Sequence, residues 1–477
     1  MSNSIRQGLR ADDFQIPPHR QAIVVVRKLR VKCQTNKISV LMRFYFLLLF
    51  LVPVCSFGQK TKENASAFRL NKIANDYVRL GLCIGQYDGD FVDAYYGPDS
   101  LKPTTAKQAS FPKDSFLKAV NNLQVQLTPF ITNKKDASLS NRAKWISSQL
   151  TAFSRRVKMF AGEQSSFDQQ AKELFGVEPP TFDEGYFRSL VKQLQSILPG
   201  EGAVYSRFQE LANHFIIPKE KLDTVIKVTI AESRKRTMKY FELPPSEGFQ
   251  MEYVTGKVWG GYNWYLGNYQ SLLQFNTDAT AFIDRIIEVA SHEGYPGHHV
   301  YNTLLEKNLY RDKGWIEISL YPLFSPQSLI AEGSANYGVE LAFPKKEKIK
   351  FIEKVLLPLA GLDTTGLSTY FKALEIKGKL AYVRTEIGRG HLNGKMIDAE
   401  AIRWLIDYNL LNEKDADRSL SFIKKNQSYV INYTFGMDLV KNYIESRGGT
   451  ENNPSKRWSL FKWLLSNEVI PADLQIK

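Results

Sequence analysis

The sequence predicts a mainly helical protein of the α+β class, in which a small aromatic-rich sheet lies beside a metal-binding helix. Apolar residues recur at helical spacing through most of the chain after residue 66. One run, residues 257–275, is instead aromatic and punctuated by glycine, as strands are. A histidine-rich segment follows it at residues 292–299. Together these features favour helices around one small sheet and one metal centre.

Residues 1–58 have the pattern of a leader. Met42 precedes an arginine, eleven apolar residues and then Ser56-Phe57-Gly58, whose small residues predict cleavage before Gln59. We expect translation to begin at Met42, so that residues 1–41 are an upstream extension and residues 42–58 are a signal peptide for secretion or the periplasm. An apolar run of eleven residues is too short to cross a bilayer as a helix. No stable membrane insertion is therefore expected once the signal is removed.

The three cysteines agree with this interpretation. Cys33 and Cys55 lie in the leader and only Cys83 remains after it, so the mature chain can form no internal disulfide. Cys55 offers a lipid anchor as an alternative. Pro53 and Val54 precede it, however, where lipoprotein processing needs small residues.

Residues 59–245 are predicted to form a helical N-terminal region, and residues 246–477 a catalytic zinc-binding region. Helical spacing recurs at residues 67–81, 114–127, 139–160, 165–175, 183–198 and 219–241. The last of these carries mixed charges throughout, which predicts a solvent-facing spacer helix. Between the first two, residues 87–103 are rich in Gly, Asp, Tyr and Pro without calcium-ligand spacing, which favours a structured loop.

The aromatic run at residues 257–275 predicts strands at the border of the catalytic region. Such a strand either pairs with the extended backbone of a substrate or covers the core as a hairpin. Asn276-Thr277-Asp278 then predicts the cap of a helix over residues 279–290, and this helix would deliver His292.

The segment Ser291 to His299 places three imidazoles and one carboxylate within eight residues, in a chain with six histidines. His292, Glu293, a second histidine and the distant Glu332 form the residue set of a catalytic zinc site, with three ligands and a glutamate base. A helix–turn junction that happens to carry histidines is the alternative.

The spacing of these histidines is unusual, because Pro296 stands where the second ligand of a regular metal-binding helix would be. His298 and His299 lie six and seven residues after His292. A bulge at Pro296-Gly297 that absorbs two residues would return His298 to the face of His292. We therefore predict His298 as the second ligand, with His299 as an alternative ligand or a supporting hydrogen-bond donor.

Glu332, Asn336 and Glu340 recur at four-residue spacing and share one face of a second predicted helix. Glu332 is the ligand candidate. Asn336 and Glu340 either orient the imidazoles or form surface contacts.

The motif H-E-G-Y-P-G-H-H-V, followed by A-E-G-S-A-N-Y-G-V-E, resembles the bacterial "domain of unknown function 885" family. The resemblance covers roughly residues 70–470, with strong motifs only after residue 250. It implies a helical, zincin-like metallopeptidase of the gluzincin type, with His292, His298 and Glu332 as zinc ligands and Glu293 as general base. Two segments depart from the family pattern, Arg389-Gly390 and Phe435-Gly436-Met437, and both departures affect expected substrate contacts.

The expected activity is zinc-dependent cleavage of peptide bonds in exported or envelope peptides, with Glu293 activating water. His391 is the favoured donor to the oxyanion; the other candidates are Arg384, Arg389, Tyr433 and Tyr443. A zinc hydrolase of non-peptide amides or esters, and a non-catalytic envelope-binding protein on the same scaffold, are the alternatives. The oligomeric state is not predicted.

The net charge is +14, but residues 1–58 hold nine Lys or Arg and two Asp or Glu, which leaves +7 on the rest. No basic run is interleaved with aromatic residues, so no nucleic-acid partner is expected. The basic excess indicates a solvated surface, with attraction to anionic peptides as the alternative.

Overall fold

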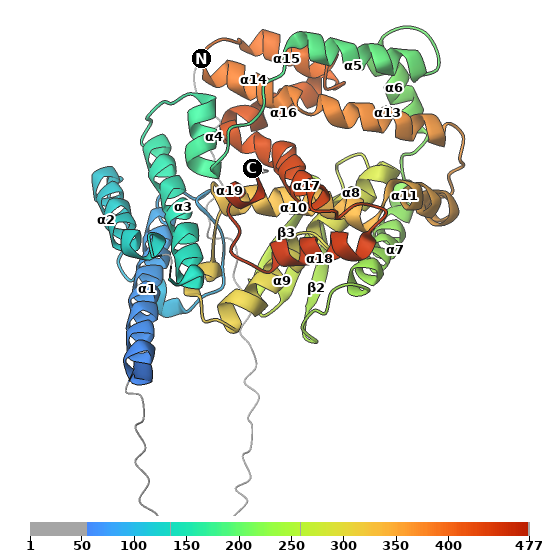
Figure 1. The fold of residues 1–477 in the computed structure, drawn as a ribbon. Coiled ribbons are helices and arrows are strands. Elements are labelled where there is room, and N and C mark those ends of the chain that lie inside the picture. The colour runs from blue at the N-terminus through green and yellow to red at the C-terminus, as the bar shows by residue number, and fades with distance from the viewer. Residues whose placement is uncertain (1–54, 134, 258, 476–477) are drawn as a thin grey trace, which may run out of the picture. The chain divides into compact units, whose positions relative to one another are not determined.

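The chain is mostly helical in the computed structural model, which describes residues 55–133, 135–257 and 259–475 (Figure 1). The predicted fold class is confirmed, since helices surround two small sheets. Residues 57–477 form one compact unit, so the predicted division at residue 245 separates segments of a single body. The predicted leader lies outside the described residues up to position 54. Among the described residues, no helix combines the length and apolarity needed to cross a membrane.

The N-terminal half supplies a series of helices that follow the predicted apolar spacing. Asp136, Ser166 and Asp183 each cap a helix by accepting a hydrogen bond from a backbone N–H three residues on. The elements are α1 (Cys55–Gly85), β1 (Val92–Tyr95), η1 (Asp99–Leu101), α2 (Lys113–Ile131), α3 (Ala137–Phe160), α4 (Phe167–Phe175), α5 (Glu184–Ile197), α6 (Val204–Asn213) and α7 (Lys219–Met238).

Helix α7 is not the solvent-facing spacer that its charges suggest, and this correction matters for the site. The helix packs against α8 and buries one face, which includes Leu222, Ile226 and Ile230. Its Ser233 Oγ lies 3.0 Å from Oγ of Ser291, the residue before His292. The charged residues occupy the outward positions, while residues spaced three and four apart line the buried face.

The aromatic segment folds into a hairpin, as its pattern indicates, and a third strand joins it. Strands β2 (Gly248–Val254), β3 (Gly261–Gly267) and β4 (Gln270–Asn276) have the order β2-β4-β3, with β2 parallel and β3 antiparallel to β4. Asn268 and Tyr269 form the two-residue turn with φ of 55° and 63°, both in the left-handed region. The second sheet pairs β1 with β5 (Leu320–Pro322) antiparallel.

The C-terminal half contains the helices of the predicted metal site. Helix α10 lies at its centre, because nearly all of its side chains are buried. The elements are α8 (Ile283–Glu293), α9 (His298–Leu305), η2 (Glu306–Arg311), η3 (Ile316–Ser319), α10 (Pro326–Ala342), α11 (Lys345–Phe351), η4 (Ile352–Leu356), α12 (Leu357–Ala360), α13 (Leu367–Leu380), α14 (Val383–Leu392), α15 (Asp398–Asp407), α16 (Glu413–Asn426), η5 (Gln427–Tyr433), α17 (Phe435–Ser446), α18 (Pro454–Leu465) and α19 (Pro471–Leu474).

Helix α8 begins later than predicted. It starts at Ile283 rather than residue 279, and its N-cap residue Phe282 offers no side-chain acceptor. Asn276 is instead committed to the hairpin, because its side-chain amide donates to the carbonyls of Lys257 and Trp259. The polar triplet at residues 276–278 therefore closes the sheet and does not cap the helix.

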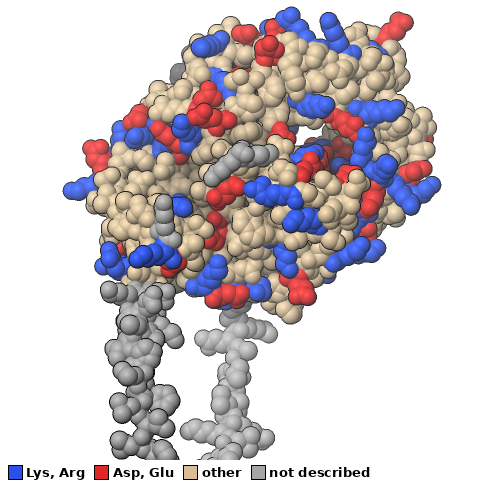
Figure 2. All heavy atoms as spheres, in the orientation of Figure 1, with Lys and Arg blue, Asp and Glu red and all other residues tan. Residues whose placement is uncertain are grey.

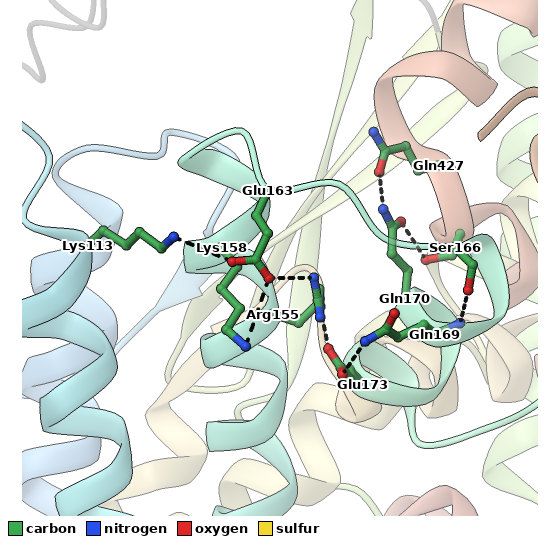
Figure 3. Close-up of polar contacts among 10 residues, drawn as sticks. Lys113, Arg155, Lys158, Glu163, Ser166, Gln169, Gln170, Glu173 and Gln427 are labelled. Atoms are coloured by element: carbon green, nitrogen blue, oxygen red, sulfur yellow. Dashed lines mark hydrogen bonds and ion pairs between the residues drawn. The ribbon is translucent and has the colours of Figure 1, made fainter. Parts of the chain in front are cut away.

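A polar cluster between α3, α4 and η5 joins distant parts of the chain (Figure 3). Buried Arg155 on α3 forms ion pairs with Glu173 on α4 and with Glu163. The side chain of Gln170 on α4 donates to that of Gln427 at 2.6 Å, at the start of η5. Helix α4 thereby holds in place the segment that carries Tyr429 and Tyr433.

Acidic and basic side chains are interspersed over the face shown in Figure 2, and both signs occur at the rim of an opening through that face. The basic excess of the sequence is thus dispersed over this face.

Candidate metal centre

Helix α8 ends at Glu293 and α9 begins at His298, so the histidine motif spans two helices instead of one bulged helix. The backbone N–H of Gly294 still donates to Ala290, whereas that of Gly297 turns back to the carbonyl of Ser291 at 3.0 Å. A Cβ on Gly297 would lie 1.8 Å from the carbonyl oxygen of His292. The predicted bulge is wrong in form, but the break has the expected consequence of bringing His298 back to His292.

His292, His298 and Glu332 converge, with one ligand atom of each within 4.8 Å of the others. The two imidazole Nε2 atoms are 3.0 Å apart, and Glu332 Oε2 lies 3.3 Å from His292 Nε2 and 3.7 Å from His298 Nε2. Atoms that bind one zinc ion tetrahedrally at 2.0–2.1 Å are about 3.3 Å from each other. The spacing of the three atoms therefore fits a zinc ion.

The orientation of His292 is set by Asn336 on α10. Asn336 donates its amide N–H to the carbonyl of Tyr433 at 2.9 Å, which leaves Oδ1 to accept from His292 Nδ1 at 2.9 Å. Nδ1 therefore carries the proton, and Nε2 turns an unshared electron pair toward the cluster. Glu340 points elsewhere, since it pairs with Lys441 at 2.9 Å.

Glu332 divides its two oxygens in the same way. Tyr429 donates to Oε1 at 3.1 Å, while buried Oε2 has no hydrogen-bond donor in the described part of the chain. Burial alone would raise the pKa of Glu332, but the positive charge of His298 and the proximity of both imidazoles hold this pKa well below its usual range. A buried carboxylate oxygen without a donor is what a cation-binding site requires.

The imidazole of His298 is charged in the absence of a metal ion. Burial lowers its pKa, but the nearby carboxylates of Glu332, Glu293 and Asp93 together outweigh burial and raise the pKa to about 9. A proton at this position compensates the negative charge that a divalent cation would otherwise neutralise.

His299 is outside the cluster, because both of its ring nitrogens have other partners. Nδ1 contacts Ser271 Oγ on β4 at 2.8 Å, and Nε2 donates to Glu247 Oε2 at 2.9 Å. Tyr295 donates to the same oxygen at 2.6 Å, and Arg234 on α7 pairs with the other oxygen. Glu247 thus fastens the break between α8 and α9 to the sheet and to α7.

Glu293, the predicted base, is buried beside the cluster. Burial raises its pKa, the carboxylate of Glu332 adds to this effect, and the imidazoles of His292 and His298 oppose it. A raised pKa suits a carboxylate that must accept and then release a proton near neutral pH. Asn263 on β3 donates to the backbone carbonyl of Glu293 at 2.6 Å.

Strand β3 passes close to the side chain of Glu293. A Cβ on Gly261 would lie 2.4 Å from Val289 Cγ1 and 3.2 Å from Glu293 Cγ, so glycine permits this approach. Strand β3 is also an edge strand of its sheet, so an edge strand passes next to the base at Gly261.

The structure separates the predicted oxyanion donors into two groups. His391 Nε2 donates to Asp398 Oδ1 on α15 at 2.9 Å, Arg389 binds Asp168 and Glu386, and Tyr443 stacks on Trp463. None of these contacts leads to the metal cluster. The role predicted for His391 thus has no support from its contacts.

Tyr433 and Arg384 form the second group, in which Tyr433 lies within reach of the charge of Glu332 and Arg384 lies near Tyr433. Burial and then the charge of Glu332 raise the pKa of Tyr433, while Arg384 opposes them. The guanidinium of Arg384 lies 5.2 Å from the ring of Phe422, and its buried Nε has no acceptor among the described residues.

Asp93 and Tyr262 lie beside the cluster, although no sequence pattern predicts them there. Tyr262 on β3 donates to Asp93 Oδ1 on β1, and the charges of His298, Glu332 and Glu293 all act on Asp93. Asp93 lies in the loop that was predicted to be purely structural. No local spacing could have revealed it, because it reaches the site from another part of the chain.

No protein-family model and no curated protein matches this sequence. Solved structures that it resembles include a Colwellia psychrerythraea protein assigned as a lipoprotein (14% identity, TM-score 0.47, 77% of this chain and 66% of that one). This chain spans just under two thirds of that protein. An M32 carboxypeptidase from Deinococcus radiodurans R1 has 11% identity and TM-score 0.45, with 86% and 94% covered. Metallocarboxypeptidase 1 of Trypanosoma cruzi has 11% identity and TM-score 0.42, with 84% and 90% covered.

Proposed function

We propose that this chain is a zinc-dependent peptidase of the gluzincin type, similar to the "domain of unknown function 885" family whose motifs it resembles. The observation that carries the proposal is the convergence of His292, His298 and Glu332 beside the buried carboxylate of Glu293. Three protein ligands leave one position open, which distinguishes catalytic zinc sites from structural ones.

His292 and His298 would hold the metal through Nε2 and Glu332 through Oε2. Zinc bound there would supply Lewis acidity and lower the pKa of water toward neutrality. Glu293 accepts the proton of the attacking water and returns it to the leaving amine. Our candidates for donors to the negative charge that develops on the substrate carbonyl are Tyr433, whose pKa responds to the charge of Glu332, and its neighbour Arg384.

Strand β3 provides the place for the substrate backbone. An extended peptide can add to the free edge of β3, and Gly261 lets that edge come within reach of Glu293. This arrangement favours peptides over esters or amides that lack a main chain.

We further propose that the protein is exported and begins at Gln59, without a lipid at Cys55. The support is the leader pattern of residues 42–58. The substrates would then be peptides of the envelope or the exterior. N-terminal sequencing of the protein recovered from each cell fraction tests this, and an intact Met1 end in the cytoplasm would contradict it.

The function is tested with the purified wild type, Glu293→Gln and Glu332→Ala. The wild type should hold about one zinc per chain and digest a mixed peptide library. Glu293→Gln should keep its zinc and lose roughly two to four orders of magnitude in kcat, because only proton transfer is removed. Glu332→Ala should lose the metal.

His391→Ala serves as the control in zinc content, since its ring contacts Asp398 and not the cluster. Zinc retained in Glu332→Ala would refute the site. Zinc-dependent turnover of esters without turnover of any peptide would favour the non-peptide alternative.

A further inference from the structure

Strand β1 has an irregularity at Asp93. Val92 pairs with Pro322 and Ala94 with Tyr321, so the register shifts at Asp93, which has no partner across the strand. A bulge of this kind turns a side chain away from the regular alternation of the strand and is frequent beside active sites. Here it turns the carboxylate of Asp93 toward β3 and the metal cluster.

The side chain of Asp93 has one carboxylate oxygen in a hydrogen bond and one that is available to a cationic ligand. Oδ1 accepts the hydrogen bond of Tyr262, and among the described residues no donor reaches Oδ2 and no Lys or Arg pairs with the carboxylate. Burial raises the pKa of Asp93 to about 6, with Glu332 and Glu293 adding to this effect and Tyr262 and His298 opposing it. The residue is half-buried and retains contact with the site.

Asp93 does not belong to the metal's own ligand set. Within the described residues, the group of donor atoms that lie within 4.8 Å of one another contains only His292, His298 and Glu332. With a divalent cation bound there, the three carboxylates of Glu332, Glu293 and Asp93 leave one negative charge unbalanced. A single positive charge on the substrate would neutralise it.

Aromatic rings lie next to Tyr262, the hydrogen-bond donor to this carboxylate. Tyr262, which holds Asp93, packs against Trp264 with ring centroids 4.7 Å apart and against Trp259 at 5.5 Å. A carboxylate with one oxygen free, held by a tyrosine that packs against two tryptophans, is a group of residues that attracts organic cations.

We propose that Asp93, together with Tyr262 and its neighbouring tryptophans, binds a primary ammonium group of the substrate. The proposal rests on the proposed peptidase function and assigns a substrate class to the same site. Two sources share this chemistry, the free amino end of a peptide and the side chain of lysine. In this arrangement Asp93, at the bulge in β1, binds the ammonium group, and the free edge of β3 binds the backbone of the peptide.

The experiment compares three tetra-alanine peptides on the zinc-loaded wild type. One has a free amino end, the second is N-acetylated, and the third is N-acetylated with one alanine replaced by lysine. Since a hydrogen bond to a charged group is involved, the wild type should favour the free peptide over the acetylated one by roughly 10- to 100-fold in kcat/KM. Recovery with the lysine peptide would assign the site to a side chain instead of the amino end.

Asp93→Asn should reduce this preference to within about twofold, chiefly through KM, and keep its zinc. Asp93→Glu retains the charge and should restore part of the preference. The control is Asp312→Asn, which alters an exposed carboxylate paired with Lys307. Equal kcat/KM values of the wild type for all three peptides would overturn the proposal. An Asp93→Asn variant that keeps the full preference for the ammonium peptides, or that loses its zinc, would also overturn it. If Asp93→Asn does not fold, the wild-type comparison alone decides.

Calorimetric binding of the same peptides to zinc-loaded Glu293→Gln separates this proposal from the proposed function. Preference for the ammonium peptides in binding, without any turnover by the wild type, would refute the peptidase and leave the ammonium site standing. Turnover of the peptides without any preference for an ammonium group would support the peptidase and refute the ammonium site.

Discussion

Two of the candidate ligands at the metal centre use one polar atom for a hydrogen bond to a neighbouring side chain and direct the other polar atom toward the cluster. His292 gives Nδ1 to Asn336 and keeps Nε2 free, and Glu332 gives Oε1 to Tyr429 and keeps Oε2 free. Such neighbours orient the ligands before the metal arrives, which reduces the entropy lost on binding. The residues behind the ligands should therefore affect metal affinity without touching the metal.

Asn336→Leu tests this directly. Leucine is similar in volume but cannot accept the Nδ1 proton of His292, so zinc affinity should fall roughly 10- to 100-fold. Competition with a chelator measures it. Glu340→Gln, one turn further along the same helix face, should leave the affinity unchanged because Glu340 pairs with Lys441. Equal affinities in both variants would show that Asn336 does not orient the ligand.

Glu247 should make stability depend on pH. Burial alone would raise its pKa, but hydrogen bonds from His299, Tyr295 and Arg234 lower the pKa from 4.5 to about 2. Because the folded-state pKa is the lower one, the stabilisation is fully present above pH 4.5 and is lost as the pH falls toward 2.

Urea unfolding of the wild type and Glu247→Gln measures this effect. At pH 7 the variant should be less stable by about 1–3 kcal/mol, and the difference should shrink between pH 4.5 and 2. A difference that stays constant over this interval would exclude Glu247 as its source.

At the level of elements, the site depends on the interruption between α8 and α9. The sequence predicts a distortion at Pro296-Gly297, and the structure resolves it as two helices with Gly297 as the N-cap residue of the second. Helix α7 contacts the end of the first through Ser233, and its Arg234 pairs with Glu247, which binds the residues after the break. The ligands are thus held by two helix ends and not by one continuous face.

Gly297→Ala should disrupt this arrangement. The added methyl group would meet the backbone carbonyls of His292 and Ser291 at 1.8 Å and 2.6 Å, so the backbone would have to move. We expect a loss of about 3 kcal/mol in the free energy of unfolding, together with weaker zinc binding. Gly260→Ala, where nothing lies within 4 Å, is the matched control in thermal unfolding. Identical melting temperatures for the two variants would contradict the close approach.

Across the whole molecule, buried polar contacts join segments far apart in the sequence. Gln170 reaches Gln427 from 257 residues away, and Arg142 on α3 forms a bidentate pair with Glu317 on η3 from 175 residues away. Arg142 also donates to Asn71 at 2.7 Å. These contacts tie the N-terminal helices to the segments that flank the metal centre.

Arg142→Ala should cost about 3–5 kcal/mol in the free energy of unfolding, because it leaves the carboxylate of Glu317 buried without a counter-charge. The double variant Arg142→Leu/Glu317→Gln removes both charges and should be less destabilised than the single one. Urea unfolding of the three proteins measures this. A double variant that is at least as destabilised as Arg142→Ala would contradict this expectation.

The sequence by itself determined the fold class, the helices with strong apolar spacing, the hairpin and the set of candidate ligands. These follow from residues close together in the chain, because a helical or alternating period acts within a few turns. The pair His298 and His299 could be ranked for the same reason, since helix geometry limits which of them can return to His292. The ligand role itself stays a prediction until metal is measured.

Only the tertiary structure decided which distant residues meet at the centre. Asp93, Ser233 and Tyr429 lie between 59 and 199 residues from the histidine motif in the sequence, yet each contacts the site or a residue beside it. The tertiary structure also decided that His391 pairs with Asp398 and that one face of α7 is buried. Such contacts arise from the packing of apolar faces around α10, and the choice of neighbour depends on the whole core, which no local period encodes.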